Sequence, residues 1–263
     1  MAIKIYKVDA FASGPFLGNP AAVCILDEEV DKNWMQKVAN EMNLSETAFL
    51  YSVGDRYNLR WFTPTVEVDL CGHATLASAH ILREEAYLKP NQNIEFITRS
   101  GVLRVSKNEY LIELDFPSDP EQEAPIPKGL KEGLGINPTY IGKNRFDYLV
   151  QVEGEEKVRS LNPNFDLLKT VLARGIIVTS VCESEEYDFV SRFFAPSSGI
   201  NEDPVTGSAH CCLGPFWEKK LSKPKLKGLQ VSKRGGVVHV SLVKNGVLLG
   251  GEAVTIFRGE MRY

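Results

Sequence analysis

Hydrophobic and polar positions along the chain predict many short strands and few helices. Residues 3–11 alternate, which is typical of a half-buried strand, whereas residues 21–26 form a continuous apolar run, which indicates a buried strand. Helical spacing appears in residues 33–41, with Asp31 as the expected N-cap. Further strands are expected at residues 48–51, 57–62, 94–98, 101–107 and 111–116.

The second half of the chain repeats this mixture of elements. Strands are expected at residues 145–152, 175–181, 187–194, 228–232, 237–243 and 247–257, and helices at residues 125–134 and 165–173. Lys244-Asn245-Gly246 predicts a hairpin turn between the last two strands.

Runs of strands with isolated helices predict the α+β class. The segment 117–127, rich in proline and acidic residues, is interpreted as the linker between an N-terminal half at residues 1–116 and a C-terminal half at residues 117–263. The final strand, near residues 252–263, is a candidate to pack back onto the N-terminal half.

Two short segments, one in each half, follow the same plan. Arg60-Trp61-Phe62-Thr63-Pro64 precedes Cys71-Gly72-His73-Ala74, and Arg192-Phe193-Phe194-Ala195-Pro196 precedes Thr206-Gly207-Ser208-Ala209. Each reads as a strand that ends at a proline, then a polar loop, then a helix that begins at a glycine. The copies lie about half the chain apart, so two halves with one plan are favoured over two unrelated domains.

The glycine-initiated helices supply the first candidate chemistry. The first N–H groups of a helix lack intrahelical partners and the helix dipole is positive there, so an anion can bind. Gly72 and Gly207 would let a ligand approach the backbone closely. Either helix alone is more typical of an ordinary capped helix than of a binding site. The repeat, with a polar residue after both glycines, favours a shared site for one carboxylate-bearing ligand.

Glu46 lies at the entry of a predicted strand. A glutamate in that position is usually solvated and inert. Here, however, no lysine or arginine lies between Asn40 and Gly54, and the neighbours are apolar or hydroxylic. Burial in such surroundings raises the pKa of a carboxyl group, which suits a general base or acid near neutral pH. Glu67 and Asp69, by contrast, are expected to face water.

Composition argues against several classes of partner. With 30 Lys and Arg against 34 Asp and Glu, the net charge is -4, which argues against nucleic acid and gives no basic face for a membrane. No apolar run approaches transmembrane length. The chain runs straight into a strand pattern without a signal peptide, and its five cysteines have no CxxC spacing. A cytoplasmic protein with reduced thiols is therefore expected.

Nucleotide-binding and metal-binding motifs are absent from the sequence, so no cofactor and no metal are expected. His73, Asp203 and Glu46 could in principle gather around a metal ion, but this interpretation is disfavoured. Cys71, beside a helix start, is either a nucleophile with a lowered pKa or a buried bystander.

Five segments, taken jointly, resemble the phenazine-biosynthesis PhzF-like isomerase family of the diaminopimelate-epimerase-like superfamily. They occur in the family's order over most of the chain: Gly18-Asn19-Pro20-Ala21-Ala22-Val23, Ser45-Glu46-Thr47-Ala48-Phe49, Phe62-Thr63-Pro64, Gly72-His73-Ala74-Thr75 and Glu202-Asp203-Pro204-Val205-Thr206-Gly207-Ser208-Ala209-His210. The resemblance implies two pseudo-symmetric halves, each a mostly antiparallel sheet or partial barrel around a central helix, with a cleft between them. It also implies catalysis without cofactor or metal, and commonly a homodimer.

The resemblance also implies roles for particular residues. The family's catalytic glutamate carries over to Glu46, its histidine to His73, and its acidic and hydroxyl residues to Asp203 and Ser208. In the phenazine enzyme itself, a proton moves between ring carbons of a dihydro-hydroxyanthranilate on one face. A cofactor-independent isomerase of a small carboxylate-bearing substrate is therefore expected. The other implied substrate-binding residues are Asn19, Gly72 and Gly207.

One departure from related epimerases matters. Those enzymes use two cysteines, one before each glycine, whereas this chain has Cys71 in the first copy and Thr206 in the second. Two-thiol racemisation is therefore disfavoured, and one carboxyl group that shuttles a proton fits better. The alternatives are an amino-acid epimerase or racemase that uses Cys71 with Glu46 or His73, and a non-catalytic small-molecule-binding homologue.

Overall fold

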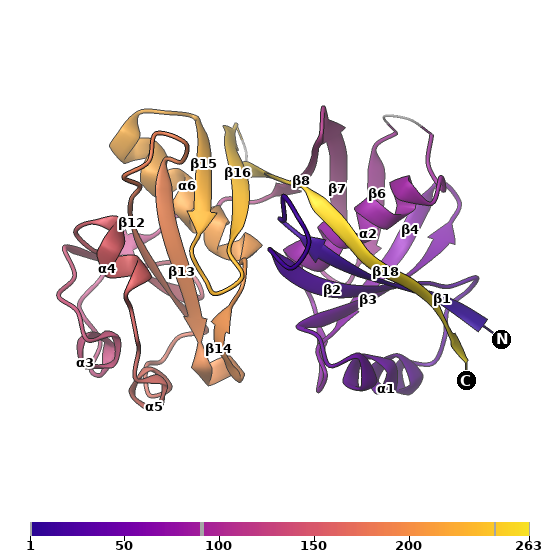
Figure 1. Ribbon diagram of the computed structural model, residues 1–263, viewed down its shortest axis with the longest axis horizontal. Helices are drawn as coiled ribbons and strands as arrows, with labels where there is room; N and C mark the ends of the chain where they lie inside the picture. Colours follow the sequence, from indigo (N-terminus) through magenta and orange to yellow (C-terminus); the bar gives the residue numbers. More distant parts are fainter. Residues whose placement is uncertain (1, 90–91, 245, 263) are drawn as a thin grey trace. The chain divides into compact units, whose positions relative to one another are not determined.

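The fold is described from a computed structural model, for residues 2–89, 92–244 and 246–262 (Figure 1). The chain divides into two compact units, Met1–Phe116 with Gly250–Tyr263, and Pro117–Leu249. Within the described ranges, every helix is too short or too polar to serve as a membrane span.

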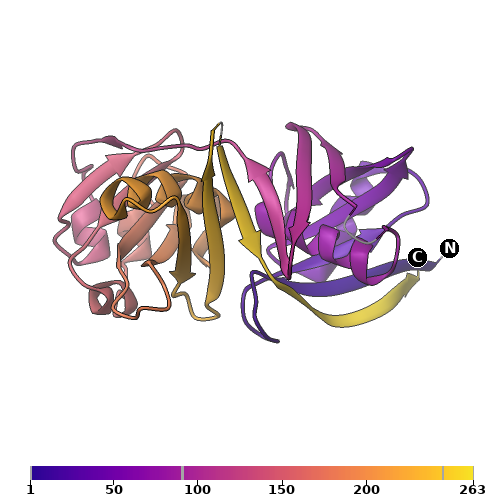
Figure 2. The same cartoon turned by 90° about the horizontal axis from the view of Figure 1, so that it is seen from above.

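The first unit is a mixed sheet around one long helix. Its strands are β1 (Ala2–Ala10), β2 (Asn19–Ile25), β3 (Glu46–Val53), β4 (Arg56–Phe62), β5 (Glu67–Val68), β6 (Ile94–Thr98), β7 (Gly101–Asn108), β8 (Leu111–Phe116) and β18 (Ala253–Arg262), and its helices are α1 (Lys32–Met42) and α2 (Gly72–Glu84). β1 pairs antiparallel with β18, and the two strands lie side by side in Figures 1 and 2. The direction of strand pairing alternates from β1 to β7: β1–β2 is antiparallel, β2–β3 parallel, β3–β4 antiparallel, β4–β6 parallel and β6–β7 antiparallel. The last pair, β7–β8, is also antiparallel.

Helix α2 forms the centre of this unit. It packs against β1, β2, β3, β8 and β18, and nearly all of its side chains are buried. Its alanines at 74, 77 and 79 let the strands approach closely. Near its C-terminal end, Nε2 of His80 lies 3.0 Å from Oγ1 of Thr255, which links α2 to β18. The helix start is therefore fixed by packing on several sides.

The second unit repeats this plan. Its strands are β9 (Gln122–Glu123), β10 (Tyr140–Lys143), β11 (Asp147–Gln151), β12 (Gly175–Val181), β13 (Phe189–Ala195), β14 (Ile200–Asp203), β15 (Lys225–Gln230), β16 (Gly236–Val243) and β17 (Gly246–Gly251), and its helices are α3 (Leu130–Leu134), α4 (Glu155–Arg159), α5 (Phe165–Leu168), α6 (Gly207–Leu221) and the 3₁₀ turn Pro196–Ser198. Helix α6 packs against β15 and β16. Trp217 of α6 stacks on Phe189 and donates a hydrogen bond of 3.0 Å to Oγ1 of Thr179 in β12.

The order of strand pairings confirms the internal repeat. β10–β11 is antiparallel, β11–β12 parallel, β12–β13 antiparallel, β13–β15 parallel and β15–β16 antiparallel, which matches β1 through β7 step for step. Each unit also holds the same bidentate ion pair. Arg60 donates to Glu67 over 2.8 and 3.1 Å, and Arg192 donates to Glu202 over 2.6 and 2.9 Å. In the first unit this ion pair joins β4 to the short strand β5, and in the second unit it joins β13 to the short strand β14. In both units the short strand precedes the central helix.

The expectation that Glu67 faces water is wrong. Its side chain is only 2% exposed and lies between Lys32, Arg60 and Arg99. Burial raises the pKa of Glu67, but hydrogen bonds and charge from the three cations outweigh it and lower the pKa to about 2. Asp69 does face water, with 68% of its side chain exposed.

Several predicted bounds are also wrong. Residues 247–257 form two strands rather than one, because the chain passes from the second unit to the first at Gly250. The helices expected at 125–134 and 165–173 shrink to α3 and α5, and β5, β9, β10, β14 and α4 were not predicted. These elements are too short to show a period in the sequence. The predicted hairpin turn includes Asn245, which lies outside the described residues.

Candidate active site at the starts of two central helices

The first cluster joins the starts of β3 and α2. Glu46 is the first residue of β3 and pairs with Ala21 of β2, and His73 is the second residue of α2. Oε2 of Glu46 lies 3.1 Å from Nε2 of His73, and the two side chains are 14% and 7% exposed. This contact is an ion pair when His73 is protonated.

Cys71 extends this cluster on the other side of the imidazole ring. Its Sγ lies 3.5 Å from Nδ1 of His73, so the thiol and the Glu46 carboxylate contact different nitrogens of one ring. The three side chains also offer ligand atoms within 4.8 Å of one another, which is close enough to hold a metal ion. The same contacts would let a proton pass among the three groups.

Electrostatics in this cluster favour a protonated imidazole. Burial alone lowers the pKa of His73, but the neighbouring Cys71 and the Glu46 carboxylate outweigh it and raise the pKa well above its ordinary value. Burial, and then the charge of Glu46, raises the pKa of the Cys71 thiol. The charge of Glu46 thus acts on both neighbours: it favours the imidazolium of His73 and disfavours the thiolate of Cys71.

The second cluster lies at the start of α6. The hydroxyl of Thr206 donates to the carboxylate of Asp203, and it accepts no capping hydrogen bond from an N–H group of the helix. Fully buried Gln230 accepts a hydrogen bond of 2.9 Å from the backbone N–H of Thr206 and donates one of 2.8 Å to the carbonyl of Asp203. These contacts fix the loop that carries Asp203.

Both central helices begin without a side-chain cap. The residues before them, Cys71 and Thr206, make no side-chain hydrogen bond to the first turn. Helix α1 differs, because Oδ1 of Asp31 accepts hydrogen bonds from the N–H groups of Asn33 and Trp34, as predicted. Helices α2 and α6 begin at Gly72 and Gly207, where the sequence predicted their starts. The residue before each of these two helices therefore supplies no cap to the first N–H groups.

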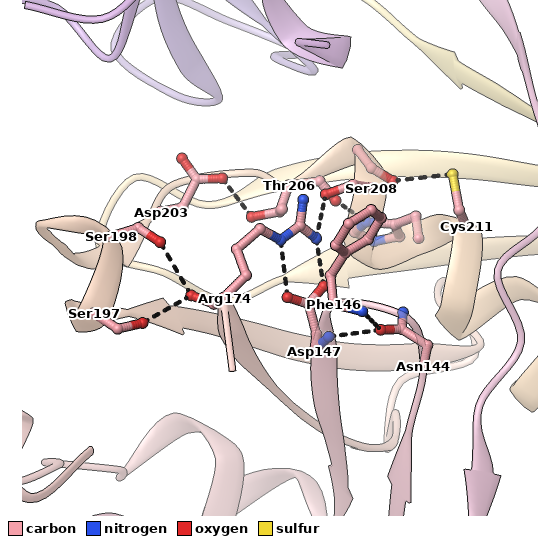
Figure 3. A network of polar contacts seen from close by, with 12 residues as sticks. Asn144, Phe146, Asp147, Arg174, Ser197, Ser198, Asp203, Thr206, Ser208 and Cys211 are labelled. Carbon is pink, nitrogen blue, oxygen red and sulfur yellow. Dashed lines mark hydrogen bonds and ion pairs between the residues drawn. The ribbon is translucent and has the colours of Figure 1, made fainter. Parts of the chain in front are cut away.

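The remaining predicted residues have distinct surroundings. Ser208, the second residue of α6, is partly exposed and accepts a hydrogen bond of 3.1 Å from Nη2 of Arg174 (Figure 3). Asn19 is fully buried at the start of β2, two residues before the strand partner of Glu46. The structure thus brings Glu46 and His73 together with Cys71, and it places Asp203 and Ser208 at the start of α6.

Sequence reasoning missed Arg174 and Gln230. Gln230 ends a strand far along the chain from Asp203 and carries no motif. Arg174 had a positional signal, because it immediately precedes a β-branched strand in the second half, as Ser45-Glu46 precedes one in the first half.

Comparisons with known proteins place this architecture in a family. Residues 8–259 match the family described as phenazine biosynthesis-like protein. An uncharacterized isomerase of Halalkalibacterium halodurans is 57% identical over 262 residues, which cover 99% of each chain. The crystal structure of a PhzF family protein of Enterococcus faecalis is 43% identical and matches all of both chains with a TM-score of 0.96.

More distant structures share the fold alone. A probable proline racemase of Agrobacterium radiobacter, solved with bound carbonate, is 10% identical, with a TM-score of 0.67 over 99% of this chain and 93% of that one. These likenesses confirm the predicted α+β fold of the diaminopimelate-epimerase-like type. The chain therefore belongs to the phenazine biosynthesis-like PhzF family, and it is an enzyme of the isomerase class.

Proposed function

We propose that this isomerase moves a proton between carbon atoms of a small carboxylate-bearing substrate without a cofactor, with Glu46 as general base and acid. One observation carries the proposal. A carboxylate and an imidazole that favours protonation lie 3.1 Å apart, largely buried, at the uncapped start of α2. A base beside a positive charge is the arrangement that carbon-acid chemistry requires, because removal of the proton leaves negative charge on the substrate.

In this mechanism, Glu46 takes a proton from a substrate carbon and the bonding electron pair shifts into the adjacent conjugated system. The protonated His73 stabilises the negative charge that develops, and the N–H groups at Gly72 and His73 hold a carboxylate or enolate oxygen. Glu46 then returns the proton to a second carbon on the same face. The reaction consumes and releases no other reactant.

Asp203 and Ser208 are proposed to orient the substrate and share protons, with Gly207 and Asn19 as further binding residues. Their support is the family resemblance and the fixed, uncapped start of α6. The homodimer is likewise a proposal from the resemblance, and light scattering on the purified protein would test it.

Glu46→Gln tests the assignment of the base. The amide keeps the shape of the side chain but cannot accept a proton, so turnover should fall by about 10²–10⁴-fold. Calorimetry with the same substrate should still detect binding, and thermal unfolding should show an intact fold. Turnover close to that of wild type would remove Glu46 from the mechanism. Binding by wild type without any turnover or proton exchange would favour the non-catalytic alternative.

A second candidate function is an epimerase or racemase that uses Cys71. The specific observation is the 3.5 Å contact between Sγ of Cys71 and Nδ1 of His73. Because its pKa is raised, the thiol suits proton donation better than proton removal. Cys71→Ala decides between the two functions: loss of activity favours the epimerase, and retained activity favours the single-carboxyl isomerase.

A further inference from the structure

The start of β12 in the second unit corresponds to the start of β3 in the first. In the first unit, the first pair of residues between β2 and β3 is Ala21 with Glu46. In the second unit, the first pair between β11 and β12 is Asp147 with Gly175. Where the first unit places Glu46 against His73, the second unit places Arg174, one residue before β12, against Ser208. The start of the central helix thus contacts an acidic side chain in the first unit and a positively charged side chain in the second.

Arg174 is held in one orientation by several contacts (Figure 3). Its Nε donates to Oδ1 of Asp147 over 2.9 Å, and its Nη2 donates both to Oδ2 of Asp147 and, over 3.1 Å, to Oγ of Ser208. The rings of Phe146 and Phe193 lie 5.0 and 5.8 Å from the guanidinium carbon. Such a paired and stacked guanidinium has little freedom to turn.

Asp147, the anchor of this fork, is itself fixed. Its side chain is fully buried, and its backbone N–H donates a hydrogen bond of 2.6 Å to Oδ1 of Asn144. Oδ1 of Asn144 also accepts from the N–H of Phe146 over 2.9 Å. The turn from Asn144 to Asp147 therefore holds the carboxylate in place at the start of β11.

The surrounding charges make Arg174 a poor anchor for a free anion. Burial lowers its pKa, but the hydrogen bonds and charge of Asp147, and the charges of Asp119 and Asp203, outweigh it and raise the pKa. The positive charge of the guanidinium is therefore already balanced by the negative charges of neighbouring carboxylates. Its contact with the serine hydroxyl has a more direct consequence.

A guanidinium can only donate hydrogen bonds, so Oγ of Ser208 must act as acceptor toward Arg174. The serine proton is then directed away from Arg174 and is free to be donated elsewhere. We propose that the Arg174–Asp147 pair is a positioning device that fixes Ser208 as a hydrogen-bond donor to the substrate. The inference rests on the proposed function, because it assumes that Ser208 contacts the substrate.

A double-mutant cycle tests the inference. Initial rates of deuterium entry from D₂O into dihydro-hydroxyanthranilate are compared for wild type, Arg174→Lys, Ser208→Ala and the double variant. A lysine lacks the rigid planar fork that pairs with both oxygens of Asp147 while one nitrogen reaches Ser208, so Arg174→Lys should lower kcat/KM about tenfold. In the Ser208→Ala background, adding Arg174→Lys should lower kcat/KM by less than about twofold, because the two residues act as a unit.

Arg159→Lys is the matched control. Arg159 also pairs with a largely buried carboxylate of the second unit, that of Glu155. The substitution Arg159→Lys should leave kcat/KM within about twofold of the wild-type value. An equal fold-loss from Arg174→Lys with and without the Ser208 hydroxyl would overturn the inference alone. No exchange by wild type with this compound or with a panel of small amino and hydroxy acids would overturn the proposed function, and the inference with it.

Arg174→Lys leaves the buried Asp147 poorly paired and should lower the melting temperature, which thermal unfolding measures. The double change Arg174→Gln with Asp147→Asn removes both charges and should show the same dependence on Ser208. A measurement without substrate completes the test. The side-chain NMR resonances of Arg174, assigned by their loss in Arg174→Lys, should shift in Ser208→Ala and not in Ser232→Ala. Unmoved resonances would overturn the contact on which the inference depends.

Discussion

The starts of α2 and α6 show how one scaffold carries two chemistries. Both helices begin at a glycine without a side-chain cap, and both follow a strand fixed by the same arginine–glutamate pair. At α2, however, the side chains that meet are Glu46 and His73, which can exchange protons. At α6 the corresponding region joins Arg174, one residue before the counterpart of Glu46, to Ser208, and an arginine does not give up its proton. The comparison fits the proposal that the first unit transfers the proton and the second orients the substrate.

The two arginine–glutamate pairs differ in their surroundings, and this difference predicts the largest effect on stability. Glu202 is paired with Arg192, whose Nη1 also donates to the carbonyl of Leu161, whereas Glu67 has Lys32 and Arg99 besides Arg60. Arg192→Met should therefore lower the free energy of unfolding by about 3–5 kcal/mol. Arg60→Met should cost about 1–3 kcal/mol, because two cations remain beside Glu67.

Urea denaturation of both variants checks this order. Adding Glu202→Met to Arg192→Met removes the unpaired carboxylate and should recover a large part of the loss. Equal losses in the two units would show that the additional cations around Glu67 contribute nothing.

The histidines of the two helices should respond to pH in opposite directions. Burial lowers the pKa of His210 to about 4, below its ordinary value of 6.5. The unfolded chain therefore binds more protons between these values, and the free energy of unfolding should fall by up to about 3 kcal/mol as the pH drops from 6.5 to 4. The pKa of His73 is raised, so its contribution is complete below 6.5 and is lost as the pH rises through the folded value.

Unfolding measured against pH in His210→Gln isolates the first effect. The glutamine can still donate to the carbonyl of Thr206, as Nδ1 of His210 does over 2.8 Å, but it does not titrate. The slope between pH 6.5 and 4 should become shallower than in wild type. An unchanged slope would assign the acid sensitivity to other groups.

The smallest expected effect concerns the one helix of the first unit that has a side-chain cap. Asp31→Ala should lower the free energy of unfolding by about 1 kcal/mol, because two N–H groups of α1 lose their acceptor. Asp31→Asn keeps an acceptor oxygen and should stay within a few tenths of a kcal/mol of wild type. A loss from Asp31→Asn as large as that from Asp31→Ala would mean that charge, rather than capping, stabilises the start of α1.

Local pattern was sufficient for much of the fold. The repeat of an arginine-aromatic strand, a polar loop and a glycine predicted both central helices, and the strand entry predicted the place of Glu46. The family resemblance implied roles for Glu46 and His73, but no spacing in the sequence predicted their contact. Its 3.1 Å separation depends on how β3 packs beside α2.

The missed features all depend on residues distant in sequence. The burial of Glu67 depends on cations from α1, β4 and the turn after β6, so its polar local sequence was misleading. Arg174 meets Ser208 only because β12 and α6 are placed side by side by the fold. Pairings of this kind leave no periodic signal in the sequence.

Proton NMR in D₂O tests the central claim most directly. Wild type and Glu46→Gln would each be mixed with dihydro-hydroxyanthranilate and with a panel of small amino and hydroxy acids. The mechanism predicts that wild type alone introduces deuterium at a substrate carbon, at the position that receives the proton from Glu46. Deuterium entry at an equal rate with Glu46→Gln would contradict the claim that Glu46 transfers the proton.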